Sequence, residues 1–197
     1  MYNLSTPWLG AAIRWFMKTL KWINLDITTR CTLQCPQCTR TWYYNKRPPG
    51  SDMTVDQFKK ILDYFDGILF CGQYSDPIYH PKFIEFLQMC VNKDNVRVNT
   101  AASHRSIDWY KQAFEANPNA WWRFGIDGLP KDSHRYRVNQ DGEKLFDVML
   151  MAKDMGLYVE WQVLAFDYVI PQLNQIKQLA AKHNLNLAID EPRRRKV

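Results

Sequence analysis

Short apolar runs alternate along this chain with segments whose apolar residues recur every three or four positions. The runs predict six strands, at residues 22–27, 67–71, 95–100, 121–126, 157–166 and 185–189. The segments between them predict five helices, one beginning at Thr54 and the others at 81–91, 107–116, 143–155 and 171–183. Alternating strands and helices form βα units and a mainly parallel sheet. Because a closed barrel needs eight units, we predict an α/β fold, a partial (β/α)6 barrel of the TIM type.

Two of the predicted helices carry specific signals at their ends. Thr54 and Gln57 have the spacing of a capping box, in which each residue accepts a hydrogen bond from the other's backbone. Gly156 directly follows the 143–155 segment, at the position where helices favour a glycine after their last turn. We therefore expect one helix to begin at Thr54 and another to end before Gly156.

Polar and small residues gather where the predicted strands end. The loop at 72–77 follows the second strand, Asn99 and Thr100 close the third, and Asp127 and Gly128 close the fourth. Parallel α/β folds bind their ligands at the carboxyl ends of the strands. These residues therefore mark one rim of the sheet as the expected binding site.

Three cysteines, Cys31, Cys35 and Cys38, follow the first predicted strand in a CxxxCxxC pattern. A cluster of four irons and four sulfides needs a ligand for each iron. Three thiolates leave one iron open to another molecule, and an open position is typical of catalytic metal sites. A structural zinc knuckle is the alternative, although no fourth cysteine or histidine lies near these three in the sequence.

Composition narrows the setting of this chemistry. A chain of 197 residues with 46% hydrophobic residues suits one domain with one core. The net charge of +6 is mildly basic and is weak evidence for nucleic-acid binding. The basic cluster at 193–196 is either a solvated tail or a nucleic-acid contact. We divide the chain into an N-terminal helical extension at 1–20, the barrel domain at 21–190 and a basic tail at 191–197.

The cysteine count and the hydropathy indicate a cytoplasmic protein. Five cysteines, three of them crowded together, fit reduced metal chemistry better than a disulfide framework, and Cys71 and Cys90 are interpreted as small core residues. No run of about 18 apolar residues predicts a membrane span. The apolar stretch at 8–16 lacks the flanks of a signal peptide and predicts an amphipathic helix packed on the domain.

Taken together, these motifs resemble those of the radical S-adenosylmethionine (radical SAM) superfamily over about residues 20–190. The CxxxCxxC loop after the first strand is the hallmark of that superfamily. Residues 76–81 resemble its Gly-Gly-Glu-Pro segment, and residues 99–103 resemble the end of its third strand. Residues 124–128, followed by His134 and Tyr136-Arg137, resemble the Ser-Ile-Asp-Gly run of the branch that often carries a SPASM domain. Residues 161–166 resemble its adenine-side strand.

The resemblance implies a [4Fe-4S] cluster whose open iron is chelated by S-adenosylmethionine. It implies reductive cleavage to methionine and a 5′-deoxyadenosyl radical, which abstracts hydrogen from a substrate such as a peptide, a nucleotide or a small metabolite. An electron donor such as flavodoxin or ferredoxin is the implied partner. The implied site residues are the metal ligands Cys31, Cys35 and Cys38, and the cofactor-binding residues Gln37, Gly72, Tyr74, Ser75, Asp76, Asn99, Asp127, Arg137, Val163 and Leu164.

The chain departs from the motifs of the superfamily at three places. Gln37 stands where an aromatic residue usually precedes the third cysteine. Asp76 is one methylene shorter than the usual glutamate, so the backbone of Gly72 or Ser75 is an alternative contact for the ligand's amino group. Gly125 stands where a serine is common. No cysteine follows the sixth predicted strand, so we do not expect a SPASM domain.

Alternatives to these interpretations follow from ordinary structural roles. Asp76, Asn99 and Asp127 are alternatively ordinary turn residues at the ends of strands. Arg137 is alternatively a member of a surface ion pair. His80 and His134 are alternatively structural histidines held by hydrogen bonds. The aromatic segment at 42–44 is either a packed loop or a substrate entrance, and residues 8–20 are a candidate wall for the open barrel. The alternative function is a zinc- or cluster-stabilised nucleic-acid-binding module. The sequence does not name the substrate or the oligomeric state, and it does not decide whether S-adenosylmethionine is consumed or regenerated.

Overall fold

Six parallel strands form one open sheet in the computed structural model, which describes residues 22–44 and 49–192. The spatial order is the chain order, β1-β2-β3-β4-β5-β6, and every neighbouring pair is parallel. The strands are β1 (Trp22–Leu25), β2 (Gly67–Phe70), β3 (Asn95–Thr100), β4 (Trp121–Gly125), β5 (Val159–Leu164) and β6 (Asn186–Asp190). The predicted α/β partial barrel is thus confirmed, and all of its strands are parallel.

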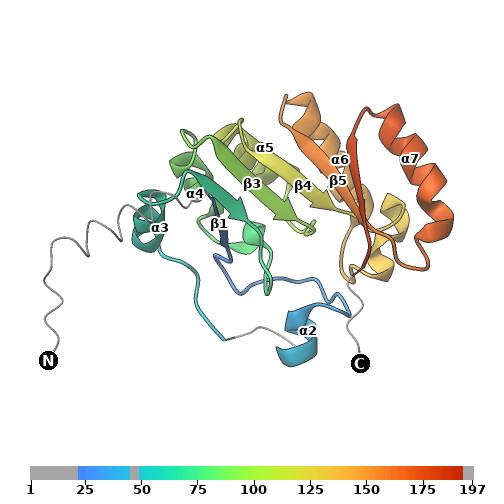
Figure 1. Cartoon of the computed structure of the whole chain (residues 1–197), viewed down its shortest axis with the longest axis horizontal. Helices are drawn as coiled ribbons and strands as arrows, with labels where there is room; N and C mark the ends of the chain where they lie inside the picture. The colour runs from blue at the N-terminus through green and yellow to red at the C-terminus, as the bar shows by residue number, and fades with distance from the viewer. Residues whose placement is uncertain (1–21, 45–48, 193–197) are drawn as a thin grey trace, which may run out of the picture.

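Six α-helices lie in the described part of the chain. They are α2 (Thr39–Tyr44), α3 (Val55–Leu62), α4 (Phe83–Met89), α5 (Ile107–Ala116), α6 (Gly142–Asp154) and α7 (Leu173–Lys182). Helices α4 to α7 lie along one face of the sheet, whereas α2 lies apart, beside the loop that follows β1 (Figure 1). No helix among the described residues is both long and apolar enough to cross a bilayer. The predicted extension at 1–20 and the basic cluster at 193–196 lie outside the described residues.

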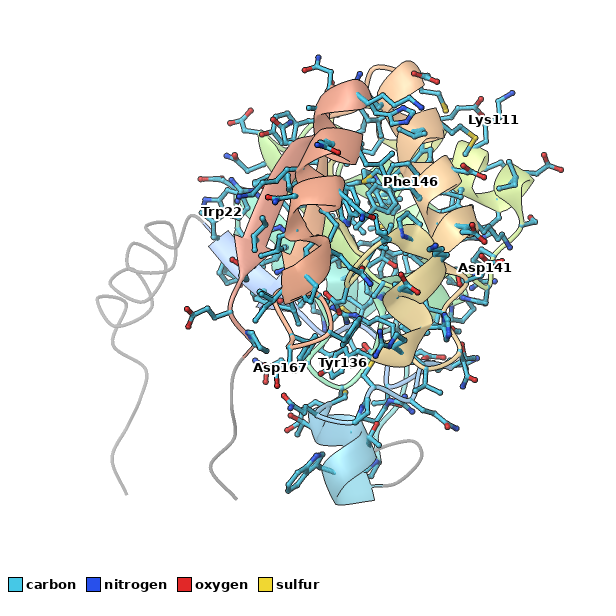
Figure 2. The ribbon with its side chains drawn as sticks, turned by 90° about the vertical axis from the view of Figure 1, so that its right-hand side faces the viewer. Trp22, Lys111, Tyr136, Asp141, Phe146 and Asp167 are labelled. Carbon is cyan, nitrogen blue, oxygen red and sulfur yellow. The ribbon has the colours of Figure 1, made fainter. Side chains whose placement is uncertain are left out.

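The helix-covered face holds the hydrophobic core. The strand register aligns buried side chains across the sheet, since Phe70 pairs with Val98, Val98 with Trp122 and Trp122 with Val159. Helices add large apolar side chains to these rows: Phe146 on α6, labelled in Figure 2, packs edge-on against a strand tryptophan at 5.2 Å between ring centroids. Burial of such aromatic surface is the main stabilising contribution to the fold.

The opposite face of the sheet, called here the open face, carries the alternate residues of the same strands. In β3 and β5 buried residues alternate strictly with partly exposed ones, because successive side chains point to opposite faces. One row of the open face runs from Asn99 through Arg123 to Glu160. No described helix covers this face. Its rows mix polar side chains with a few apolar ones such as Leu69 and Trp121, where those of the core are apolar.

The predicted helix signals are confirmed, and several boundaries differ from the prediction. Thr54 caps α3 with both hydrogen bonds of the capping box, and Gly156 follows α6 with a positive φ of 87°. Pro81 precedes α4 instead of opening it, because a 3-10 turn at Pro77–Tyr79 comes first and Lys82 is the N-cap. The aromatic segment 42–44, interpreted as a packed loop or a substrate entrance, is the second half of the short helix α2.

Candidate functional site

The three clustered cysteines lie in the loop between β1 and α2, and neighbouring loops hold this loop in place. The backbone N–H of Gln34 donates to the carbonyl of Val138 at 3.1 Å. Asn139 donates from its side chain to the carbonyl of Thr32 at 2.9 Å, and the hydroxyl of Thr32 contacts that of Tyr79. Hydrogen bonds to residues of two other loops therefore hold the cysteine loop in position.

The three thiols line one cavity of about 200 Å³, called here the cysteine cavity. Its other lining residues come from several strand ends: Leu33, Arg40, Gly72, Gln73, Ser75, Asp76, Ala101, Tyr136 and Arg137. Figure 2 shows Tyr136 on the side of the molecule where α2 lies. Several strand ends thus converge on the cysteines, as parallel topology predicts.

Burial controls the protonation of these thiols. Desolvation raises the pKa of Cys31 to about 12, and it also raises the pKa of Cys35. The guanidinium groups of Arg40 and Arg137 act in the opposite direction on Cys31 and Cys35 respectively. Without metal the thiols of Cys31 and Cys35 are protonated near neutral pH, so metal binding there must release protons, and the two arginines stabilise the resulting thiolates.

The chemistry of the donor set fits a group larger than one metal ion. Among the described residues, no three His, Cys, Asp or Glu side chains converge closely enough to hold a single ion. Cys31, Cys35 and Cys38 instead line one cavity of about 200 Å³, which has room for a cluster that offers a separate metal atom to each thiolate.

Asp76 lies between β2 and β3, and its carboxylate is turned toward the protein. It accepts hydrogen bonds from the Thr100 hydroxyl at 2.9 and 3.0 Å and from the backbone N–H groups of Ala101, Ala102 and Ile78 at 2.8, 3.1 and 3.3 Å. Burial raises its pKa, while these donors lower it. Asp76 fixes the loop after β2 to the end of β3, although it also lines the cavity.

Asp26, just beyond β1, holds the first half of the same loop. Its carboxylate accepts from the backbone N–H groups of Gln73 and Tyr74 at 2.8 and 3.0 Å and from the Ser75 hydroxyl. A Cβ added at Gly72 would come within 2.4 Å of the Ser75 carbonyl oxygen. The tight loop therefore requires glycine at 72, and it brings the backbone of Gly72 and Ser75 to the cavity wall.

Arg137 connects the cysteines to the end of β4. Its Nε donates to Asp127 Oδ2 at 2.7 Å, and the Asp127 side chain is fully buried. Asp127 Oδ1 also accepts from the backbone N–H of Leu164 at 2.8 Å. A Cβ at Gly125 would lie 3.1 Å from Arg137 Nη2, so the glycine leaves room for the guanidinium. Arg137 is thus a fixed cation beside Cys35, not a surface ion pair.

A second cavity, of about 230 Å³, continues from the first along the open face and is called here the central cavity. The two cavities share Gly72, Ser75, Asp76, Ala101 and Arg137. The central cavity adds Cys71, Asn99, Thr100, Arg123, Gly125 and Gln162. Cys71, interpreted as a core residue, thus faces the open side of the sheet, whereas Cys90 is fully buried in the core.

The structure brings most of the predicted site residues together, but not all of them. The three cysteines, Gly72, Ser75, Asp76, Asn99 and Arg137 line the two cavities. Gln37 and Tyr74 are exposed and line neither, and Asp127 lies behind Arg137. The Val163 side chain is fully buried in the core and Leu164 donates its N–H to Asp127, and neither residue lines the two cavities.

Sequence reasoning missed several residues that line these cavities. Arg40, Arg123 and Gln162 belong to this group, and Tyr136 was named in a motif but not as a site residue. Arg123 and Gln162 were detectable in principle, because each alternates with a buried aromatic residue of its strand. Arg40 was not, because its position depends on the unpredicted turn into α2, where its guanidinium donates to the carbonyl of Leu33.

The two histidines named from the sequence differ in their surroundings. His80 is 2% exposed and makes hydrogen bonds with both ring nitrogens, to the carbonyl of Met53 at 2.9 Å and from the N–H of Lys82 at 3.1 Å. His134 is exposed at the end of a 3-10 turn. Neither lines the cysteine or central cavity, which fits the structural role predicted for His80.

Comparison with known proteins points to one family. The family model of the radical SAM superfamily matches residues 25–180. The chain is 30% identical over 184 residues to the tungsten-containing aldehyde ferredoxin oxidoreductase cofactor-modifying protein of Pyrococcus furiosus. That match covers 87% of this chain and 50% of the relative, so the chain spans about half the length of the relative.

Solved structures share the fold at low sequence identity. Streptococcus suis SuiB bound to the precursor peptide SuiA superposes with a TM-score of 0.71 at 11% identity, covering 95% of this chain and 45% of SuiB. Methylornithine synthase (PylB) gives 0.63 at 15% identity, covering 93% and 59%. The enzyme anSMEcpe with bound S-adenosylmethionine gives 0.67 at 14% identity, covering 87% and 51%. These likenesses concern the fold.

Proposed function

The chain belongs to the radical SAM superfamily, and on that premise we propose that it cleaves S-adenosylmethionine reductively at a [4Fe-4S] cluster held in the cysteine cavity. It is a radical SAM enzyme, and membership implies chemistry that uses S-adenosylmethionine and an iron–sulfur cluster. When bound, the two groups together supply a 5′-deoxyadenosyl radical that removes hydrogen from a substrate. The protein's own contribution is to bind, orient and shield the reacting groups.

Cys31, Cys35 and Cys38 are the proposed metal ligands. The single observation that carries the proposal is that all three thiols line one cavity at the carboxyl ends of the strands. Arg137, held by Asp127, and Arg40, held by the loop carbonyl of Leu33, place two positive charges beside the future thiolates. Such charges stabilise a negatively charged cluster and influence its potential.

The amino acid end of S-adenosylmethionine is proposed to lie where the cysteine and central cavities overlap. The Asp76 carboxylate is occupied by donors of β3, so the backbone of Gly72 and Ser75 is the better acceptor for the ligand's ammonium group. Arg137 is the proposed partner of the ligand's carboxylate, because a guanidinium binds carboxylates through paired N–H donors. Asn99, deeper in the central cavity, is proposed to contact the nucleoside part.

Two similar proteins bear on what the substrate could be. The Pyrococcus furiosus relative is named as a cofactor-modifying protein, and the SuiB structure contains a precursor peptide. Because the chain resembles each over about half of that protein's length, we propose only that a small reductase protein such as flavodoxin or ferredoxin supplies the electron and that the substrate enters the central cavity.

The test is anaerobic reconstitution of the full chain with iron and sulfide, followed by reduction in the presence of S-adenosylmethionine. We expect about four irons per chain and formation of 5′-deoxyadenosine. Cys35→Ala should lose most of the cluster absorbance and all of the cleavage. Cys90→Ala is the matched control, since Cys90 lies in the core on the helix-covered face and should retain both. Full iron content in a variant that lacks all three clustered cysteines would overturn the assignment.

A further inference from the structure

The open face carries a third cavity, farther from the cysteines than the central cavity. It is lined by Leu69, Arg97, Asn99, Trp121 and Arg123, has a volume of about 60 Å³ and is called here the arginine niche. Asn99 and Arg123 also line the central cavity, so the two spaces adjoin. No role in binding the cluster or S-adenosylmethionine has been assigned to Arg97, Trp121 or Arg123.

Arg97 is held between aromatic rings. Its guanidinium carbon lies 3.8 Å from the ring centroid of Trp121 and 4.7 Å from that of Trp22. Stacking of this kind uses the face of the planar guanidinium and leaves the N–H donors at its edge. Within the described part of the chain, no carboxylate lies within ion-pair distance of Arg97. The side chain is therefore fixed in place, and no carboxylate of the described residues neutralises its charge.

Arg123 is the second cation of the niche, and Glu160 compensates its positive charge. The strand register sets it opposite Glu160, with which it forms an ion pair, and the two side chains are 29% and 14% exposed. Among the described residues, the Glu160 carboxylate pairs with Arg123 alone, and Arg97 has no carboxylate partner. The indole N–H of Trp121 is also buried and has no hydrogen-bond partner among the described residues. The niche therefore combines an excess positive charge with unused donors.

We propose that the arginine niche binds a single anionic group of the substrate, a carboxylate or a phosphate. At about 60 Å³ the niche is much smaller than the central and cysteine cavities, so it suits one functional group better than a whole molecule. Arg97 supplies a pre-oriented set of donors, as arginines do at carboxylate and phosphate sites. This inference rests on the proposed function, because it assigns the niche to the substrate of that reaction.

The position of the niche also defines the shape of that substrate. Along β3 and β4, Arg97 and Trp121 lie four residues before Ala101 and Gly125, which line the central cavity. Four residues of strand span roughly 13 Å. An anion in the niche therefore lies several bonds away from a carbon beside the S-adenosylmethionine site. Binding at such a remote group positions the reacting carbon without contact at the reacting atoms.

The experiment measures anion binding to the reconstituted full chain by calorimetry, with inorganic phosphate and acetate as separate probes at constant ionic strength. We expect anion binding that depends on Arg97, distinct from any binding at Arg137, and the stronger probe identifies the class of anion. Arg97→Gln and Arg123→Gln should each weaken that binding about ten-fold or more, which is the usual effect of losing a hydrogen bond to a charged group. Arg97→Lys keeps the charge but not the planar donors and should be intermediate.

Arg135→Gln is the matched control. Arg135 also packs on an aromatic ring, at 4.5 Å from the centroid of Tyr168, but it is exposed and lines none of the three cavities. Its substitution should change phosphate or acetate binding less than two-fold. The inference is overturned if the unmodified chain binds neither anion, or if Arg135→Gln weakens binding as much as Arg97→Gln does.

Failure of this inference and failure of the proposed function are separable in the same preparations. Cleavage of S-adenosylmethionine by the unmodified chain without anion binding would overturn the niche and leave the radical SAM assignment intact. Anion binding that depends on Arg97, in a preparation that holds no cluster and forms no 5′-deoxyadenosine, would overturn the proposed function and with it the role of the niche as a substrate subsite.

Discussion

The two faces of the sheet are built from the same strands, yet they have opposite characters. On β4, Trp122 is fully buried against the helices, whereas its neighbour Arg123 lines two cavities on the open face. On β5, Trp161 and Gln162 repeat this division. Because successive side chains point to opposite sides of a strand, one stretch of sequence specifies both the core and the proposed substrate surface.

The difference shows how stability and chemistry are separated in this fold. The helix-covered face must be apolar and closely packed, since burial there provides most of the favourable free energy of folding. The open face makes few demands of that kind and accommodates arginine, glutamate and glutamine. The two requirements meet at the rim, where the cysteine loop and Arg137 lie, because Asp127 is buried but its partner Arg137 faces the cavity.

The largest expected effect tests this separation with neighbouring residues. Trp122→Ala removes a fully buried aromatic side chain and should lower the free energy of unfolding by about 3–5 kcal/mol. Arg123→Gln should lower it by only about 1 kcal/mol, since it removes a partly exposed ion pair. Urea denaturation of the two variants under anaerobic conditions measures both values. Equal losses of stability would show that the open face is part of the folding core.

The second prediction concerns the rim, where fold and function overlap. Arg137→Gln leaves the buried Asp127 carboxylate without its cation and should destabilise the protein by about 3 kcal/mol. It should also weaken S-adenosylmethionine binding by roughly ten- to a hundred-fold, through loss of a charged hydrogen bond. Denaturation and calorimetry on the reconstituted chain measure the two effects.

The double variant Arg137→Gln with Asp127→Asn separates those two effects. Replacing the carboxylate by a neutral amide removes the uncompensated buried charge, so most of the stability should return. The affinity for S-adenosylmethionine should stay low, because the guanidinium is still missing. If affinity and stability recover together, Arg137 supports the fold only and is not the carboxylate partner.

The sequence predicted features that depend on local pattern. The six strands and five of the helices follow from periodicity, and the cysteines, only a few residues apart, were recognised by their spacing. Helix α2 was missed because a six-residue helix shows too little periodicity. The inward orientation of Asp76 was not predictable, since its partners Thr100 and Ala101 lie 24 and 25 residues away. The arginine niche depends on strand register, which the sequence does not state.

The smallest expected effect lies on the helix-covered side, where one buried polar group is sensitive to pH. The imidazole of His80 accepts from the Lys82 N–H and donates to the Met53 carbonyl, which requires its neutral form. Burial is the main cause that lowers the pKa of His80; Arg30 and Lys82 add to this, whereas the Met53 carbonyl and Asp52 oppose it. The folded protein therefore resists protonation of this ring.

The sign of the pH dependence follows from this lowered pKa. Below about pH 6.5 the unfolded chain takes up a proton on His80 that the folded chain does not, so stability falls as the pH drops toward the folded pKa. The slope is at most about 1.4 kcal/mol per pH unit.

Asp76, whose pKa is raised by burial, acts in the opposite direction at lower pH, so the difference in stability between variants is the useful quantity. Denaturation between pH 7 and 5 should show a flatter profile for His80→Gln than for the unmodified chain. An identical slope for His80→Gln would mean that the ring is protonated in the folded protein and that the Lys82 hydrogen bond does not hold it neutral.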